Sequence, residues 1–247
     1  MIFCAMTLNN ALERIKQSTS IYEYPPKAEV ECIRQNRDAA IPVLLDCIKT
    51  VVEKGESLPY NARSYYFAMY LLAEFRVNEA FPILIKYLEF DEEFMDFLLG
   101  DDLTESFSAI LASVATLADV PELQKVVANN ELFEYCRYAA LDALKDMYAE
   151  SVYPRADYFA FLKEVVGIFA DDANKIFNLT DDCYELGCNE AIPLIVELYR
   201  NGLDGGLKGD EDFSTDDLSE ADLEKMRLKL LEKKNTGFVK DMVKWLS

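Results

Sequence analysis

The sequence predicts an all-α protein, a HEAT-like α-α superhelix (a solenoid of about five helix pairs) with a C-terminal helical cap. Three observations predict this fold class. Apolar residues follow a helical period through nearly the whole chain, without the sustained alternation that indicates strands. One short segment recurs with prolines at 42, 82 and 121, close to the length of a HEAT-type helix pair. Apolar residues make up 51% of the 247 positions, which is enough for a sizeable core.

The recurring segment begins with Asp or Asn, continues through Ala, an apolar residue and Pro, and then stays apolar. The polar first residue can accept hydrogen bonds from the free N–H groups of a helix start. The proline falls near the end of the first turn, where a missing N–H costs at most one helical bond. The copies cover 38–48, 78–88 and 189–199, with a weaker copy at 119–127 and a degenerate one expected near 154–161. The predicted caps and prolines are Asp38, Asn78, Asn189, Pro42, Pro82 and Pro193.

A second kind of helix precedes several of these segments, at 63–75, 137–148 and 177–187. Its small residues let it pack closely on the following helix, and Gly187 supplies a helix stop. Aromatic residues surround the first of these helices on all sides, so we expect them in the core rather than in a ligand site. These aromatic residues are Tyr65, Tyr66, Phe67 and Tyr70.

Four parts are expected along the chain. Residues 1–22 form an N-terminal helix, and 23–202 form the repeats, whose first helix opens at Pro25 and Pro26. Residues 203–218 form an acidic loop rich in Gly, Asp and Ser, and 219–247 form the C-terminal cap. Within the cap, helices are expected at 219–232 and 237–246, docked through apolar side chains as the end of a solenoid requires. The docking residues would be Met226, Leu230, Phe238, Met242 and Trp245.

Charge narrows the choice of partner. Forty-five acidic residues stand against 25 basic ones, a formal charge of −20. Phosphate backbones and anionic membranes need clustered Lys and Arg, so we expect no nucleic acid and no membrane partner. A protein with a basic surface is favoured. The simpler interpretation is that the charge only keeps the protein soluble.

Missing residue types exclude whole classes of chemistry. The chain has no histidine, which removes Ser-His-Asp and Cys-His catalysis and nearly every catalytic zinc site. Six cysteines stand singly without a C-x-x-C pair, which indicates free thiols in a reducing cytoplasm. Phosphate-loop motifs are absent as well, so we expect no cofactor and no metal. The N-terminus has no basic region of a signal peptide, and no apolar run reaches the ~18 residues of a membrane span.

An ordered series of motifs resembles a known family. It comprises NNALERI, YPPKAEVECI, LLAEFRVNEAFPILIKYLEF, LLGDDLTESFSAILASV, EYCRYAALDAL and LGCNEAIP. Over residues 8 to about 225, the chain resembles the uncharacterised bacterial HEAT-like family catalogued as domain of unknown function 1186. The resemblance implies a HEAT-like fold and no established activity. Some members carry a cysteine-rich metal-binding tail, which we expect to be absent here because no cysteine follows Cys188.

An acidic segment is the strongest candidate site. Residues 87–124 hold ten carboxylates and no basic residue, with phenylalanines interleaved. Such a segment can capture a basic part of a partner, or it can simply be amphipathic helix with a solvated acidic face. Asp102 is also expected to cap a helix that starts near Leu103. The tentative binding residues are Asp91, Glu92, Glu93, Asp96, Asp101, Asp102 and Glu105.

Two other charged segments receive plainer interpretations. The Asp-rich stretch 204–222 lacks the order of a calcium loop, so we interpret it as a solvated linker. The basic run 225–244 is expected to dock on the acidic body rather than on a membrane surface.

These observations favour a macromolecule-binding repeat protein, a scaffold or adaptor for protein–protein interaction rather than an enzyme. One alternative is an inhibitor that mimics nucleic acid, with carboxylates where a phosphate backbone would lie. A less favoured alternative is a carboxylate-based hydrolase, which would need a deep cleft with two facing acids.

Overall fold

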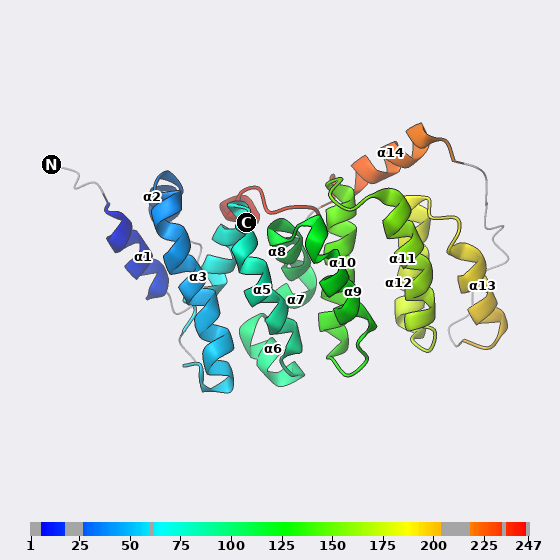
Figure 1. The fold of residues 1–247 in the computed structure, drawn as a ribbon, viewed down its shortest axis with the longest axis horizontal. Coiled ribbons are helices and arrows are strands. Elements are labelled where there is room, and N and C mark those ends of the chain that lie inside the picture. The colour runs from blue at the N-terminus through cyan, green and yellow to red at the C-terminus, as the bar shows by residue number, and fades with distance from the viewer. Residues whose placement is uncertain (1–5, 18–26, 60–61, 204–217, 234–235, 246–247) are drawn as a thin grey trace. The chain divides into compact units, whose positions relative to one another are not determined.

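The computed structural model describes residues 6–17, 27–59, 62–203, 218–233 and 236–245. Within these ranges the chain forms helices joined by turns and contains no strand (Figure 1), so the all-α prediction is confirmed. The chain divides into two compact units, each with its own internal contacts. Unit 1 comprises Met1–Ala143 and Phe238–Ser247, and unit 2 comprises Leu144–Gly237. The superhelical stacking of helix pairs stays a prediction.

Unit 1 is built from helices that pack on their sequence neighbours. Helix α1 packs on α2, α3 packs on α4, and α4 also packs on α8. The helices of this unit are α1 (Leu8–Lys16), α2 (Lys27–Gln35), α3 (Arg37–Lys54), α4 (Ser64–Glu74), α5 (Phe81–Leu84), α6 (Glu92–Leu98), α7 (Asp102–Glu105), α8 (Phe107–Val114), α9 (Val120–Ala128), α15 (Met242–Trp245) and the start of α10 (Glu134–Ala149). Short 3-10 turns join them at Gly55–Ser57, Asn78–Ala80, Ile85–Glu89 and Leu117–Asp119.

Helix α4 is the centre of this unit. Nine successive residues, Tyr65–Ala73, are buried, because α3 covers one side of the helix and α8 another. The prediction that its aromatic residues belong to the core is therefore confirmed. Their hydroxyls do not lose their hydrogen bonds on burial, since Tyr65 donates to the Leu98 carbonyl at 2.9 Å. Tyr87, in the turn before α6, likewise donates to the Ile48 carbonyl at 2.8 Å.

The recurring segments start helices, but not through the predicted caps. Proline occupies the first or second position of α5, α9 and α13 (Ile192–Arg200), whereas Pro42 lies inside α3. Asp38 is already helical, and the N-cap position of α3 is Asn36. The amide of Asn78 instead donates to the Val114 carbonyl at 2.8 Å. Asn189 is not a cap either, because Ala191 holds the N-cap position of α13. The three predicted caps are therefore wrong, since local pattern shows neither the residue at which a helix begins nor the distant carbonyl that a side chain meets.

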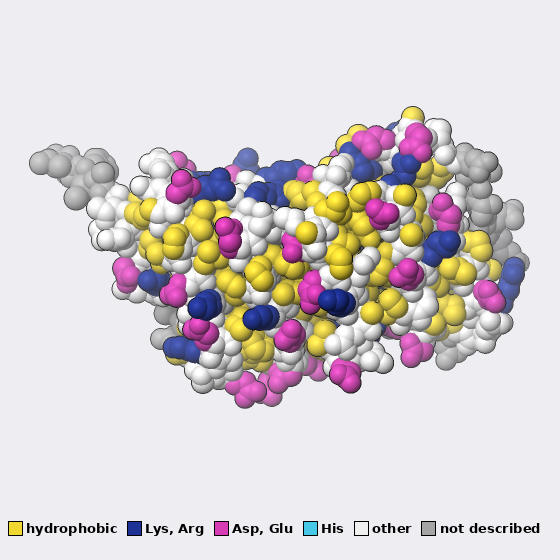
Figure 2. All heavy atoms as spheres, in the orientation of Figure 1, with side chains coloured by type: hydrophobic (Ala, Val, Ile, Leu, Met, Phe, Trp, Pro, Cys, Tyr) yellow, Lys and Arg dark blue, Asp and Glu magenta, His cyan; other side chains and the backbone are white. Residues whose placement is uncertain are grey.

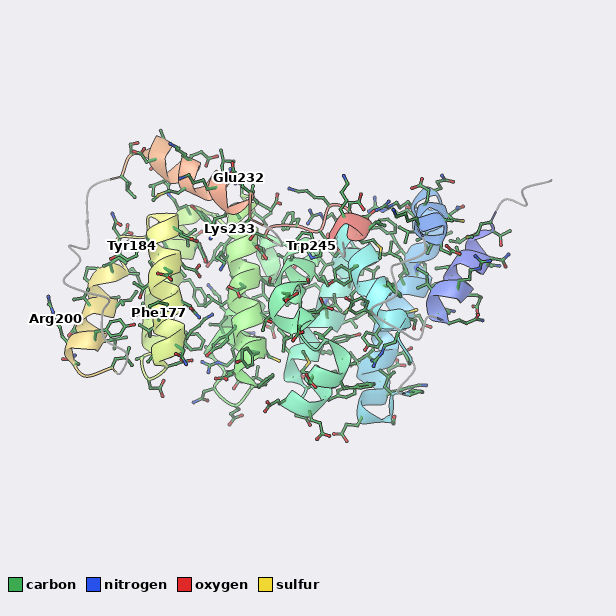
Figure 3. All side chains as sticks on the ribbon, turned by 180° about the vertical axis from the view of Figure 1, so that it is seen from behind. Phe177, Tyr184, Arg200, Glu232, Lys233 and Trp245 are labelled. Carbon is green, nitrogen blue, oxygen red and sulfur yellow. The ribbon has the colours of Figure 1, made fainter. Side chains whose placement is uncertain are left out.

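Unit 2 contains α11 (Arg155–Ile168), α12 (Ala173–Leu186), α13 and α14 (Glu220–Leu230), together with the end of α10. Helix α12 contacts α13 and α14, and α11 contacts α13. Tyr148 and Tyr158 stack in its core with ring centroids 5.0 Å apart. Gly187, with φ of 72°, ends α12 as predicted. Figure 3 shows Phe177 and Tyr184 along this helix and Lys233 just after α14.

The C-terminal cap is only partly helical. The predicted helix at 237–246 is wrong over its first half, because among the described residues 237–245 only Met242–Trp245 forms a helix. The preceding backbone bonds to side chains of unit 1 instead: Val239 N–H donates to Ser113 Oγ at 2.8 Å. Residues 204–217, which hold most of the predicted acidic loop, and Pro25 and Pro26 lie outside the described residues.

Candidate functional site

Six of the seven predicted acidic residues lie exposed on or beside α6 and α7. Asp91 caps α6 by accepting a hydrogen bond from Phe94 N–H at 2.8 Å. Glu92 and Glu93 occupy the first turn of α6, where the free N–H groups favour negative charge. Carboxylates gather along the lower edge of the face in Figure 2, around α6. The exposed residues are Asp91, Glu92, Glu93, Asp96, Asp101 and Glu105.

An aromatic layer lies directly behind these carboxylates. The rings of Phe94 and Phe97 stack with centroids 5.8 Å apart and planes at 21°. Phe90 meets Phe94 edge-on at 4.8 Å. The Arg63 guanidinium lies 4.6 Å from the centroid of Phe97 and donates to the Phe97 carbonyl at 3.2 Å. The Phe97 ring therefore already holds one cation of the chain itself.

A hollow of roughly 390 Å³ joins the carboxylates to the aromatic layer. We call it the acidic hollow. It lies between the turn that follows α3 and the start of α6, entirely within unit 1. Its lining residues are Glu56, Leu58, Asp91, Glu93, Phe94 and Phe97. Glu56 and Leu58 were missed by the sequence analysis, because no pattern in the chain links them to residues that lie more than thirty positions later.

The lining of the acidic hollow suits a cation with an apolar stem. Three carboxylates border it, and of the described residues that line it none is basic. Carboxylates close to one another repel, so a positive charge placed among them is attracted by all three. Leu58, Phe94 and Phe97 supply an apolar wall. A Lys or Arg side chain has both parts that this arrangement requires, a charged head and a methylene stem.

Asp102 differs from the other six residues. Tyr66 donates to its Oδ2 at 2.6 Å and Tyr70 donates to its Oδ1 at 3.3 Å, so the carboxylate is tied to α4. Burial raises the pKa of Asp102, and its hydrogen bonds to Tyr66, Tyr70 and Ser106 offset part of that rise. The prediction that Asp102 caps a helix is wrong, because Asp101 holds the N-cap position of α7 and the Asp102 carboxylate bonds to tyrosines. Asp102 joins α7 to the core.

Two basic residues of the C-terminal run form ion pairs within unit 2. In unit 2, Arg227 pairs with Glu224 at 2.6 Å and Lys233 pairs with Glu185. Leu230 is buried in unit 2 and Met242 in unit 1, which confirms the expected docking of these two apolar residues.

The described ranges hold neither a metal-binding cluster nor a membrane-spanning helix. No cluster of three or more His, Cys, Asp or Glu side chains there is arranged to hold a metal ion. In the same ranges, no helix combines the length and the apolar character needed to cross a membrane.

Comparison with known proteins places this chain beside uncharacterised relatives. It is 28% identical over 141 residues to a protein of Chlamydia muridarum described as uncharacterized, a match that covers 56% of this chain and 55% of the relative. An uncharacterized protein of Chlamydia trachomatis matches at 28% identity over 141 residues, covering 56% of this chain and 54% of the relative. The chain thus spans about half the length of the curated relatives it matches. No solved structure matches it.

The profile of one family matches almost the whole chain. Its description is "Protein of unknown function (DUF1186)", and the match covers residues 6–247. The resemblance found in the ordered motifs therefore extends from the first helix to the C-terminal segment. The chain belongs to the DUF1186 family.

Proposed function

We propose that this chain is a cytoplasmic, non-enzymatic helical repeat protein that binds another protein. The acidic hollow is the centre of the binding site, and it takes a Lys or Arg side chain from a basic segment of the partner. The observation that carries the proposal is the hollow itself, in which three carboxylates and two stacked phenylalanines share one cavity.

Two contributions to binding follow from this lining. The net charge of −20 attracts a basic partner over a distance and raises the association rate. Once bound, the cation lies against the Phe94 and Phe97 rings, a contact type that contributes about 0.5–2 kcal/mol. Hydrogen bonds from the cation to a carboxylate of the hollow contribute about 1.5–3 kcal/mol. The exposed acidic residues around the hollow, Glu92 and Asp96 among them, act mainly on the rate.

The repeat architecture predicted from the sequence agrees with the same proposal. Helical repeat proteins present an extended surface on which affinity is concentrated in a few central positions. A central cation in a partly apolar pocket, surrounded by exposed charge, fits that distribution.

The first experiment is affinity capture of the tagged chain from extract of its own cells, at low and at high salt. A partner with a basic surface that is lost as salt rises is the expected result, because exposed charge pairs are screened. The partner is then purified and its affinity measured by calorimetry for the wild type and for a variant with a neutral hollow, Glu56→Gln/Asp91→Asn/Glu93→Gln. Asparagine keeps the N-cap of α6.

A matched control separates the hollow from net charge. Glu79→Gln/Glu131→Gln/Glu134→Gln removes the same charge from exposed positions that do not line the hollow. We expect the hollow variant to weaken binding by tenfold or more, corresponding to about 1.4 kcal/mol, and the control to change affinity far less. Equal losses in both variants would reduce the effect to overall charge. Absence of any salt-sensitive partner would refute the proposal.

A further inference from the structure

The end of α12 brings two cysteines together. Cys188 N–H donates to the Cys183 carbonyl at 2.8 Å and Gly187 N–H donates to the Tyr184 carbonyl at 3.3 Å. With Gly187 in the left-handed region, these two bonds define a Schellman motif. In this motif the side chains four positions before and one position after the left-handed residue come into contact, and the pair is commonly apolar. Here the pair is Cys183 and Cys188.

The cap motif therefore places the two thiols side by side, and both side chains are fully buried. The neighbouring Cys188 thiol, together with burial, raises the pKa of Cys183. Cys47 and Cys136 are also buried, but on other helices, and the pKa of Cys136 rises to about 12 through burial alone. The Cys183–Cys188 pair therefore differs from these two cysteines by having a second thiol in reach.

Helix α14 and Leu218, two residues before it, cover this turn. A methyl group at Gly187 would lie 2.6 Å from a terminal carbon of Leu218 and 2.6 Å from one of Leu223, so these side chains sit on the turn. Two arginines hold the cover in place. Arg155 pairs with Glu220 at 2.5 Å, and Arg227 of α14 donates to the Ala149 carbonyl.

We propose that Cys183 and Cys188 are a redox-sensitive pair that closes to a disulfide when a hydroperoxide reaches it, with α14 controlling access. The thiolate of one cysteine attacks the peroxide, takes one oxygen and becomes a sulfenic acid, and with a proton the other oxygen leaves as water. The sulfur of the second thiol then attacks the sulfenic sulfur, an S–S bond forms, and a second water leaves. Two thiols lose two electrons and hydrogen peroxide is reduced to two waters.

Access and ionisation both depend on α14. While it covers the turn, the buried pair is scarcely ionised, and the thiolate is the form that reacts. When α14 lifts, water reaches the turn, the burial that disfavours the thiolate is relieved, and the peroxide can enter. Oxidation of this pair therefore reports the opening of α14.

The test uses the reduced, full-length chain treated with hydrogen peroxide, digested without reductant and analysed by mass spectrometry. Cleavage after Lys175 and Arg200 leaves both cysteines in one peptide, 176–200. The expected result is loss of two hydrogens from this peptide, reversed by dithiothreitol, before the peptides with Cys47 and Cys136 change. If peptide 176–200 stays at its reduced mass while those two cysteines oxidise, the proposal is overturned.

Variants test the Cys183–Cys188 pairing and the control of access by α14 separately. Arg227→Ala removes the bond to Ala149 and should raise the rate of disulfide formation several-fold, whereas Lys229→Ala, an exposed position on the same helix, should leave it unchanged. Circular dichroism checks that both variants are folded. Cys188→Ser should abolish the loss of two hydrogens and leave a sulfenic acid on Cys183 that dimedone traps. An Arg227→Ala rate equal to wild type would refute control by α14, and a loss of two hydrogens in Cys188→Ser would refute the pairing.

Discussion

Glu74 at the end of α4 holds the C-terminal segment onto unit 1, and replacing it with alanine tests that attachment. Its Oε1 accepts from Arg34 Nε at 2.7 Å, and its Oε2 accepts from Arg34 Nη2 at 2.8 Å. The same Oε2 accepts from Met242 N–H at 2.8 Å. Arg34 also donates to Asp241 at 2.8 Å. One carboxylate thus joins α2, α4 and the last turn of the chain.

The expected cost follows from these bonds. The Glu74 side chain is 11% exposed and that of Arg34 27%, so both are partly desolvated. Glu74→Ala removes a two-point ion pair and leaves Met242 N–H without its acceptor. Hydrogen bonds to charged groups contribute about 1.5–3 kcal/mol each. Because Arg34 keeps Asp241 and the bonds are not additive, we expect the free energy of unfolding to fall by about 2–4 kcal/mol.

Trp245 provides a fluorescence signal from the C-terminal segment itself. It is the single tryptophan of the chain, it lies in α15 (Figure 3), and its Nε1 donates to Ser106 Oγ at 3.3 Å. Its fluorescence during urea denaturation therefore reports release of the C-terminal segment. Glu74→Gln, which keeps an acceptor but loses the charge, should fall between wild type and Glu74→Ala. Glu79→Ala, at an exposed position, should stay within about 0.5 kcal/mol of wild type. A Glu74→Ala midpoint equal to wild type would show that Glu74 does not hold this segment.

Three more outcomes are expected. Burial raises the pKa of Asp102 in the folded state above its ordinary value of 3.8. The free energy of unfolding of wild type, relative to that of Asp102→Asn, should therefore fall as pH rises from about 4 through the raised pKa. Urea denaturation at several pH values measures it. Gly187→Ala should lower the free energy of unfolding by about 1–3 kcal/mol, because φ is 72° and the new methyl meets Leu218 and Leu223. Gly167→Ala, which has open space inside α11, should raise it by about 0.5–1 kcal/mol. Thermal melts measure both variants. Tyr87→Phe should lose about 0.5–1.5 kcal/mol in urea denaturation, since the Ile48 carbonyl loses its buried donor.

The failed expectations share a cause. Asp38 and Asn78 have the residue type of caps, yet α3 begins before Asp38, and the Asn78 amide donates to the Val114 carbonyl, 36 positions further along the chain. Residues 237–241 have helical periodicity, yet the N–H of Val239 donates to Ser113, more than one hundred positions earlier. The N–H of Met242, which follows this stretch, donates to the still more distant Glu74. Hydrogen-bond partners so distant in the chain leave no local pattern.

The candidate site divides in the same way. The acidity of α6 was visible in the sequence, because the charges of a helix are read from neighbouring residues, whereas the cap that Asp91 forms on α6 was not predicted. Folding then added Glu56 and Leu58 to the acidic hollow and turned Asp102 toward Tyr66 and Tyr70. Which carboxylates share a cavity depends on where α3 and α6 lie, and no spacing along the chain records that.

The sequence by itself determined the all-helical class, the buried character of α4, the glycine that ends α12 and the family. These properties depend on apolar periodicity and on residues close together in the chain. Only the tertiary structure decided which side chains form the acidic hollow, what holds the C-terminal segment, and that two single cysteines meet at Gly187. Packing sets these contacts, because a side chain makes the hydrogen bonds and apolar contacts that the folded neighbours offer, however distant they are in sequence.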